Sequence, residues 1–316
     1  MLLPGFSLMA YAATIEPLRS ANLMRGAELY RWTHLSPDGG AVLSSGHLPI
    51  MTETPSAGHV AALDCVILVG GLGCERYRHR GLTAFLRQVA RKGALLGAVS
   101  TASFILARAG LLAGHRCTVH WDYRPAFVEA FPTLEVSGDL FVIDGNLFTC
   151  AGGVAALDMM LQLIRQQHDP ALAALISDQF IHGSLRDARD RQRMDLQHRL
   201  GAAPQAVIKA VALMEAHIET PLSMPAITAR LKLSGRQLER LFRDSFDLTP
   251  ARYYLNLRLD AARKLLQLSS LPILDIGLAT GFVSASHFAK AYRLHFQEIP
   301  SATRQAGHQL AQFSLR

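Results

Sequence analysis

Two short stretches in the last third of the chain carry side chains suited to contacting double-stranded DNA. Arginine and glutamine can each make paired hydrogen bonds to one base, small residues let a helix lie close to base edges, and lysine reaches phosphates. These side chains fall on the outer faces of two predicted helices. The predicted DNA-binding residues are Arg236, Gln237, Glu239, Arg240 and Arg243 in the first stretch, and Ser284, Ala285, Ser286, Lys290 and Arg293 in the second.

A second set of polar residues lies in the first half of the chain. Ser100 follows an apolar run and precedes a helical segment, so it would lie at the turn from a strand into a helix. The first backbone N–H groups of that helix, which include that of Thr101, suit a carboxylate. Gly70 and Gly71 end another apolar run, and ligands of parallel sheets bind outside the carboxyl ends of the strands. The sequence therefore predicts a ligand pocket around these residues.

The DNA-contacting stretches belong to two helix-turn-helix patterns, over residues 222–242 and 271–304, which form an internal repeat. A serine is placed to cap the second helix of each copy, and apolar residues follow it on the inner face. Three pairs correspond at a spacing of 50 positions and one at 49: Ser234 with Ser284, Leu238 with Phe288, Phe242 with Tyr292, and Ile227 with Ile276. The second turn is therefore one residue longer.

Two further features concern the geometry of these copies. Lys232 occupies the turn of the first copy, where such motifs usually carry glycine, and a left-handed backbone there costs about 1 kcal/mol. Thr249-Pro250 opens a predicted helix over residues 249–267, whose apolar residues recur every three or four positions. This rigid helix should fix the two copies relative to one another.

The runs RQLERLFR, GFVSASHFAKAYR and IPSATR, together with the duplicated motif, resemble the AraC family of transcription regulators. The resemblance covers residues 204–308 and implies binding of an operator in double-stranded DNA, with RNA polymerase as a partner. Charge supports it, because residues 204–316 carry +6 of the formal net charge of +7. A basic part beside a neutral part indicates that only the former binds a polyanion.

Residues 1–167 alternate strand-like and helical runs, which is typical of an α/β domain with a mostly parallel sheet. The predicted strands lie at 30–36, 64–71, 94–100 and 146–150, and the predicted helices at 8–24, 81–92, 102–109, 122–130 and 154–167. A sheet of this type needs a full first strand before Pro4, and three residues precede it. We therefore expect the native chain to start upstream of Met1.

This half of the chain resembles the PfpI-like, class I glutamine-amidotransferase-like fold, a flavodoxin-like α/β architecture. The resemblance implies that Ser100 takes the place of a nucleophilic cysteine, with His120 and Glu16 as its neighbours. It also implies that Glu16 is near enough to accept an ammonium group, and Trp121 offers an aromatic face to a methylated one. A serine hydroxyl without a strong base is a poor nucleophile, so we predict binding without catalysis.

A PfpI-like domain followed by an AraC-type domain resembles the GlxA-like subfamily of regulators. The predicted parts are a ligand-sensing domain at 1–177, a charged linker at 178–203, a DNA-binding domain at 204–308 and a tail at 309–316. Mixed charges over residues 187–199 indicate a solvated linking helix. The resemblance implies an activator that responds to an amine or amino-acid-like metabolite of the arginine, glycine betaine or carnitine class, and a homodimer formed through the first domain.

Two alternatives remain open at this level. One is an amidase or related hydrolase that uses Ser100, His120 and Asp122 as a triad, and the other is a first domain that only dimerises. The four cysteines show no C-x-x-C spacing, and we expect reduced thiols, no metal and no cofactor. No apolar run is long enough to span a bilayer, so we expect no membrane partner and a cytoplasmic location.

Overall fold

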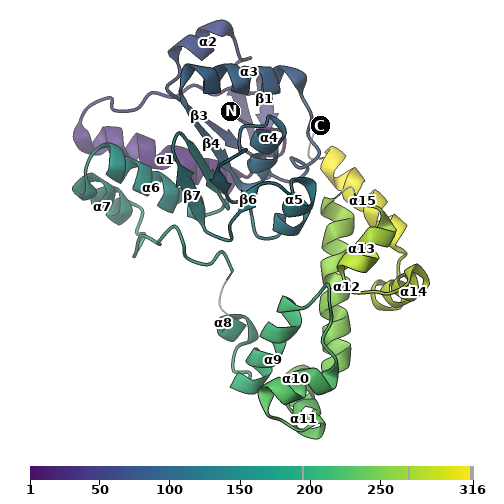
Figure 1. The fold of residues 1–316 in the computed structure, drawn as a ribbon. Helices are drawn as coiled ribbons and strands as arrows, with labels where there is room; N and C mark the ends of the chain where they lie inside the picture. Colours follow the sequence, from purple (N-terminus) through teal and green to yellow (C-terminus); the bar gives the residue numbers. More distant parts are fainter. Residues whose placement is uncertain (194–195, 270, 314–316) are drawn as a thin grey trace. The chain divides into compact units, whose positions relative to one another are not determined.

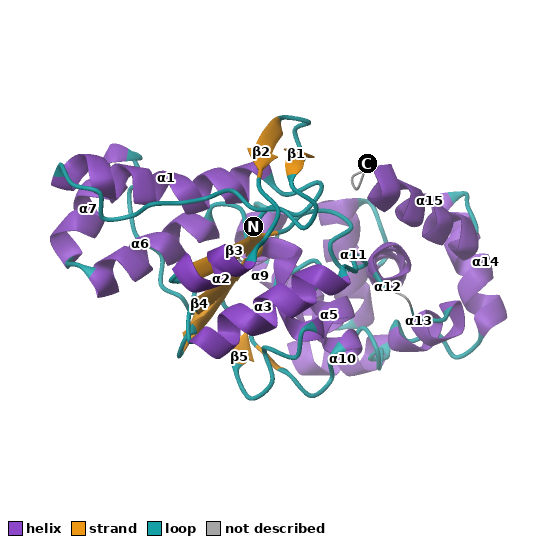
Figure 2. Cartoon of the chain, turned by 90° about the horizontal axis from the view of Figure 1, so that it is seen from above, coloured by secondary structure: helices purple, strands orange, loops and turns teal. Residues whose placement is uncertain are grey.

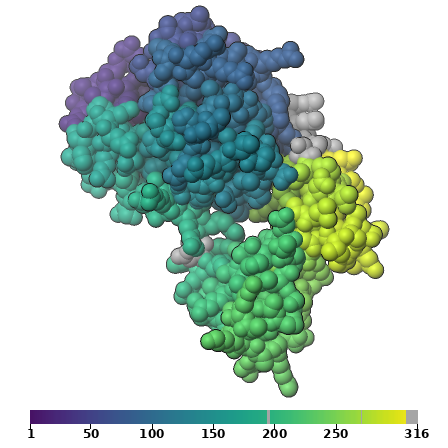
Figure 3. Space-filling view, viewed as in Figure 1, coloured from purple at the N-terminus to yellow at the C-terminus, as the bar shows by residue number. Residues whose placement is uncertain are grey.

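Residues 1–193, 196–269 and 271–313 are described by the computed structural model (Figure 1). The chain divides into two units, the first comprising residues 1–192 and the second residues 193–309 (Figure 3). None of the described helices has the length and apolar composition needed to cross a membrane. The predicted fold class is confirmed, because the first unit is α/β and the second is helical.

The first unit is built on a four-stranded sheet in the order β3-β4-β8-β7. The strands are β3 (Cys65–Val69), β4 (Leu95–Val99), β8 (Leu147–Cys150) and β7 (Phe141–Asp144). β3, β4 and β8 are parallel, and β7 pairs antiparallel with β8 at the edge. Leu96 and Val99 point to opposite faces of β4 and are both fully buried, which is expected of a parallel sheet covered on both sides.

Helices α1 (Leu8–Arg25) and α6 (Ala155–Gln167) lie side by side and pack with one face of the sheet (Figure 2). Helix α3 (Arg80–Lys92) packs against β4 and α4. The remaining elements of this unit are β1 (Gly40–Leu43), β2 (Pro49–Thr52), α2 (Ala57–Ala62), η1 (Ser100–Ala102), α4 (Ser103–Arg108), β5 (Arg116–Cys117), α5 (Arg124–Ala130), β6 (Glu135–Val136) and α7 (Pro170–Gln179). The predicted strands at 64–71, 94–100 and 146–150 and all five predicted helices are thus confirmed, with small shifts at their ends.

The predicted strand at 30–36 is wrong. The side chain of Asn22 bonds this backbone instead: its Oδ1 accepts hydrogen bonds from the N–H groups of Leu29 and Tyr30, and its Nδ2 donates to the Tyr30 carbonyl. Only Leu35 forms a bridge, to Glu53. A side chain on α1 therefore satisfies the backbone groups at the start of this segment, and the hairpin β1–β2 lies in the following segment.

The predicted linking helix over residues 187–199 is also wrong for most of its length, because among the described residues of this run only those of α8 (Leu196–Leu200) are helical. Residues 182–192 instead run along the first unit. Asp158, fully buried on α6, accepts hydrogen bonds from the His182 ring and from the backbone and guanidinium of Arg186. Leu140 N–H donates to the Ala188 carbonyl at 2.9 Å. A buried carboxylate therefore holds this charged segment in place of helix formation.

The second unit contains the two predicted helix-turn-helix copies. Its helices are α9 (Gln205–Ala216), α10 (Met224–Leu231), α11 (Gly235–Phe246), α12 (Pro250–Leu268), α13 (Ile273–Ala279), α14 (Ala285–Phe296) and α15 (Pro300–Phe313). Ser234 caps α11 and Ser284 caps α14, as predicted. Each copy has its own core, one with Leu238 and Phe242 and the other with Phe288 and Tyr292.

Helix α12 joins the two copies through two polar side chains one turn apart. The Tyr254 hydroxyl donates to the His217 carbonyl at 2.5 Å and accepts from Leu222 N–H, which ties α12 to the first copy. Arg258 donates to the carbonyls of Thr280 and Gly281 at 2.8 and 2.7 Å, which ties α12 to the turn of the second copy. The expected rigid connection therefore rests on hydrogen bonds as well as on apolar packing.

The turns of the two copies reach the same left-handed backbone conformation with different residues. Lys232 and Gly281 both have a left-handed backbone, with φ of 56° and 78°. Lys232 is exposed, whereas a Cβ at Gly281 would lie 2.4 Å from Pro221 Cγ and 2.7 Å from the Ile218 carbonyl oxygen. The lysine is therefore tolerated at a small backbone cost, but the second position has no room for a side chain.

Replacement of these two residues should have opposite effects. Lys232→Gly removes a left-handed residue with a Cβ and should stabilise the protein by up to about 1 kcal/mol. Gly281→Ala adds a colliding Cβ at a left-handed position and should destabilise it by about 2 kcal/mol or more. Urea unfolding of both variants measures the difference, and equal effects of the two changes would contradict the role given to Pro221 and Ile218.

Candidate functional site

The predicted DNA-binding residues lie on the outer faces of α11 and α14. All ten are exposed, while the residues between them, such as Leu238 and Phe288, are buried. Within the described part of the chain, the charged groups of Arg236, Arg240, Arg243, Lys290 and Arg293 have no hydrogen-bonding or ion-pair partner. These five cations are free to meet an external polyanion, unlike Arg258 and Arg263, which bond to protein groups.

Two side chains change the set of groups that can contact DNA. The Gln237 carbonyl oxygen accepts from Ser234 N–H at 2.9 Å, so it closes the predicted capping box and only its amide NH₂ is left to face a base. Val283, directly before the cap of α14, is 91% exposed and was not predicted as a contact residue. An exposed branched side chain there suits the methyl group of thymine, and the pattern missed it because Val283 lies outside the helix.

The Ser100 turn is confirmed as a sharp turn from β4 into a helix. Ser100 has φ of 65°, a left-handed value that is uncommon for a residue with a side chain. Gly152 makes the turn possible, because a Cβ on it would lie 2.7 Å from Ser100 Cβ. Gly70 faces the Ala102 N–H closely, and the Thr101 hydroxyl donates to the Gly71 carbonyl at 2.6 Å. These predicted residues therefore come together.

The other predicted pocket residues differ in position. His120 and Trp121 lie side by side, with ring centroids 5.5 Å apart, and His120 Nδ1 accepts from the Asp122 backbone N–H at 3.3 Å. Glu16 is on the exposed side of α1 and pairs with Arg19 at 2.7 Å. The role of Glu16 as the acceptor of an ammonium group stays a prediction, and such a ligand would compete with Arg19 for its carboxylate.

Beside the turn lies a buried carboxyl group that the sequence pattern missed. Glu75, in the loop after β3, has a side chain only 2% exposed and an ion pair with Arg76 at 3.2 Å. Desolvation raises the pKa of Glu75 above its ordinary value. The nearby Cys74 is fully buried, and burial raises the pKa of its thiol to about 12. This thiol is therefore protonated at neutral pH and is a weak nucleophile.

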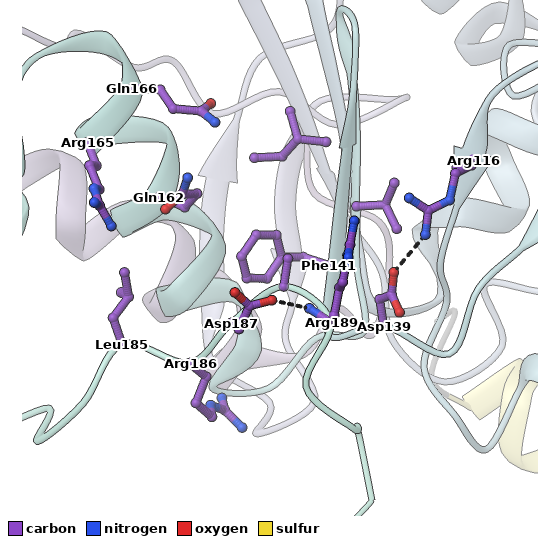
Figure 4. Close-up of a pocket in the computed structure, with 13 residues that line it drawn as sticks. Arg116, Asp139, Phe141, Gln162, Arg165, Gln166, Leu185, Arg186, Asp187 and Arg189 are labelled. Atoms are coloured by element: carbon purple, nitrogen blue, oxygen red, sulfur yellow. Dashed lines mark hydrogen bonds and ion pairs between the residues drawn. The ribbon is translucent and has the colours of Figure 1, made fainter.

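A separate cavity of about 400 Å³ lies in the first unit between α6, the edge strand β7 and residues 185–189 (Figure 4). Four arginines, two glutamines and two aspartates share its lining with apolar residues of β7. The lining residues are Arg116, Asp139, Phe141, Val142, Ile143, Gln162, Arg165, Gln166, Leu185, Arg186, Asp187, Ala188 and Arg189. The sequence gave no signal for this site, because it depends on the course of residues 185–189.

Comparison with known proteins agrees with both halves of the structure. Residues 4–166 match the DJ-1/PfpI family, and residues 227–306 match a helix-turn-helix domain. The HTH-type transcriptional regulator GbdR of Pseudomonas aeruginosa is 46% identical over 314 residues, covering 99% of this chain and 84% of GbdR. GlxA of Rhizobium meliloti, also an HTH-type transcriptional regulator, is 36% identical over 96% of this chain and 94% of its own length.

A crystal structure of an AraC family transcriptional regulator from Pseudomonas putida resembles part of this chain. It has a TM-score of 0.52 and 30% sequence identity, and it covers 57% of this chain and 96% of the other. The architecture is thus that of a DNA-binding regulator with a DJ-1/PfpI-like domain. The chain belongs to the GlxA-like subfamily of AraC-family transcriptional regulators.

Substitution of single cations should separate base reading from phosphate binding. Arg240→Ala should weaken operator binding by about 1–3 kcal/mol and relax base preference, while Lys290→Ala should weaken binding evenly and flatten its salt dependence. Lys209→Ala is the control, because this exposed cation lies on α9 outside both contact faces. Fluorescence anisotropy over a salt series measures each change, and equal losses for Lys209→Ala and Arg240→Ala would contradict the assignment.

Proposed function

We propose that this regulator activates transcription by inserting α11 and α14 into successive major grooves of an operator. The observation that carries the proposal is the set of five unpaired cations on two equivalent helices joined by α12. Adjacent major grooves on one side of the duplex are about 34 Å apart, which demands a fixed spacing between two reading helices. The hydrogen bonds of Tyr254 and Arg258 supply that constraint.

We further propose that the first unit binds a small amine or amino-acid-like effector of the arginine, glycine betaine or carnitine class. The candidate group at the turn comprises Gly70, Gly71, Ser100, Thr101, His120 and Trp121. The parts proposed on the same grounds are a sensing domain at 1–177, a linker at 178–203 and a DNA-binding domain at 204–308. A homodimer formed through the first unit, contact with RNA polymerase and a cytoplasmic location complete the proposal.

The competing function is hydrolysis by Ser100 and His120. One observation disfavours it, because His120 Nδ1 accepts a hydrogen bond from the Asp122 backbone N–H at 3.3 Å. With Nδ1 as acceptor, the neutral ring carries its proton on Nε2, which is the opposite of the arrangement in a serine-histidine-aspartate triad. All of the relatives compared above are named as regulators. Regulation without catalysis is therefore the better account.

Footprinting on the intergenic DNA upstream of its own gene tests the DNA-binding proposal. The purified chain should protect two segments about one helical turn apart on one side of the duplex. Exchange of the two segments' sequences should abolish protection, because the two copies present different side chains. Protection without sequence preference at moderate salt would contradict sequence-specific regulation.

Ser100→Ala separates sensing from catalysis. If the turn binds an effector without chemistry, this variant should retain effector-dependent reporter transcription and the ligand-dependent rise in melting temperature. Wild type and variant should both leave ester and amide substrates unchanged. A hydrolytic activity that disappears in Ser100→Ala would establish the enzyme instead.

A further inference from the structure

The cavity between α6, β7 and residues 185–189 has the size and chemistry of a small-metabolite site. Its volume of about 400 Å³ falls in the range of ligand pockets, which is about 300–1,000 Å³. In Figure 4, the Phe141 ring lies between the polar side chains of α6 and those of residues 185–189. Phe141 itself is 3% exposed, so it forms an apolar base for the site. Polar groups thus converge around an apolar centre.

Two of the four arginines in the lining are already neutralised by the protein. Arg116 pairs with Asp139 at 3.0 Å, and Arg186 pairs with the buried Asp158 at 2.6 Å. The guanidinium groups of Arg165 and Arg189 have no partner among the described residues. Arg165 lies on α6 and Arg189 in residues 185–189, and an unpaired guanidinium group suits the carboxylate of a ligand, because arginine binds carboxylates through directed, charge-assisted hydrogen bonds.

One negative group accompanies them. Asp187 Oδ1 accepts from the backbone N–H of Arg189 at 2.9 Å, and its other oxygen has no hydrogen bond within the described residues. In Figure 4, the Asp187 carboxylate points toward Phe141. A purely anionic ligand would be repelled by this group, whereas a molecule with both charges would satisfy an arginine and the aspartate together.

We propose that this cavity binds a small amino-acid-like zwitterion, with its carboxylate at Arg165 and its ammonium group at Asp187. The proposal rests on the proposed response to an amine or amino-acid-like effector, and it assigns that effector a site distinct from the Ser100 turn. Gln162 and Gln166 lie one turn apart on α6, beside Arg165, and add amide groups for the remaining polar atoms.

The position of this site connects ligand binding to the segment that precedes the second unit. Residues 185–189 form one wall and are held by Asp158 and by the hydrogen bond from Leu140 to Ala188. A ligand that touches both Arg165 on α6 and Asp187 in this segment adds a further link between them. Occupation of the cavity therefore stabilises the attached form of residues 185–189 by mass action.

Calorimetry on the full chain with glycine betaine, carnitine and L-arginine tests the assignment. Arg165→Gln and Asp187→Asn should each weaken binding by about tenfold or more, because each removes one charged partner. Asp187→Asn keeps an acceptor for the Arg189 N–H, so the local turn is preserved. Arg80→Gln, at an exposed arginine of α3 with no described side-chain partner, is the matched control and should bind as wild type does.

Trypsin provides a second readout that does not depend on affinity alone. The chain offers cleavage sites at Arg186, Arg189 and Arg191, and a bound zwitterion should slow cleavage there in wild type but not in Arg165→Gln. Binding that survives Arg165→Gln but is lost in His120→Ala would overturn the cavity and leave the proposed function standing at the Ser100 turn. If none of the three compounds binds, both the proposed ligand site and the proposed effector class are wrong. The proposed sequence-specific DNA binding is tested separately, by the footprinting experiment.

Discussion

The second unit depends on two polar contacts of α12, one at each copy of the helix-turn-helix. Each copy buries its own apolar cluster, so hydrophobic packing alone would leave two small bodies joined by one helix. Tyr254 and Arg258 bond backbone carbonyl groups, which are fixed points of each copy. Because those acceptors belong to the loop before α10 and the turn after α13, the spacing of α11 and α14 is set by backbone positions and resists side-chain rearrangement.

In the first unit, a fully buried aspartate holds separate segments together. Asp158 lies on α6, which follows the Gly152 that faces Ser100, and it binds the segment that leads out of the unit. A carboxylate in this position is stable only while its donors stay in place, since an unpaired buried charge is strongly unfavourable. The turn at Ser100, helix α6 and residues 182–192 are therefore parts of one connected structure.

Much of this architecture could be predicted from sequence, and the failures have physical causes. The repeated serine caps and apolar residues of the second unit are local signals, so its helices were predictable. The strand at 30–36 failed because the Asn22 side chain, on the preceding helix α1, bonds the backbone of Leu29 and Tyr30. The helix predicted at 187–199 is wrong because alternating charges indicate only that a segment is exposed. They do not indicate that the buried Asp158 binds His182 and Arg186 just before it.

The close fit of Gly281 against Pro221 and Ile218 bears on how the two copies can be exchanged or redesigned. Gly281, in the turn of the second copy, packs directly against Pro221 and Ile218, which lie in the loop before the first copy. A change in one of these regions therefore affects the other. In a chimaera that takes α13 and α14 from a relative, the foreign turn would pack against the original residues 217–222 of this chain. Grafts in this subfamily should therefore move residues 217–222 together with 280–282, while the outer faces of α11 and α14 can be rewritten independently.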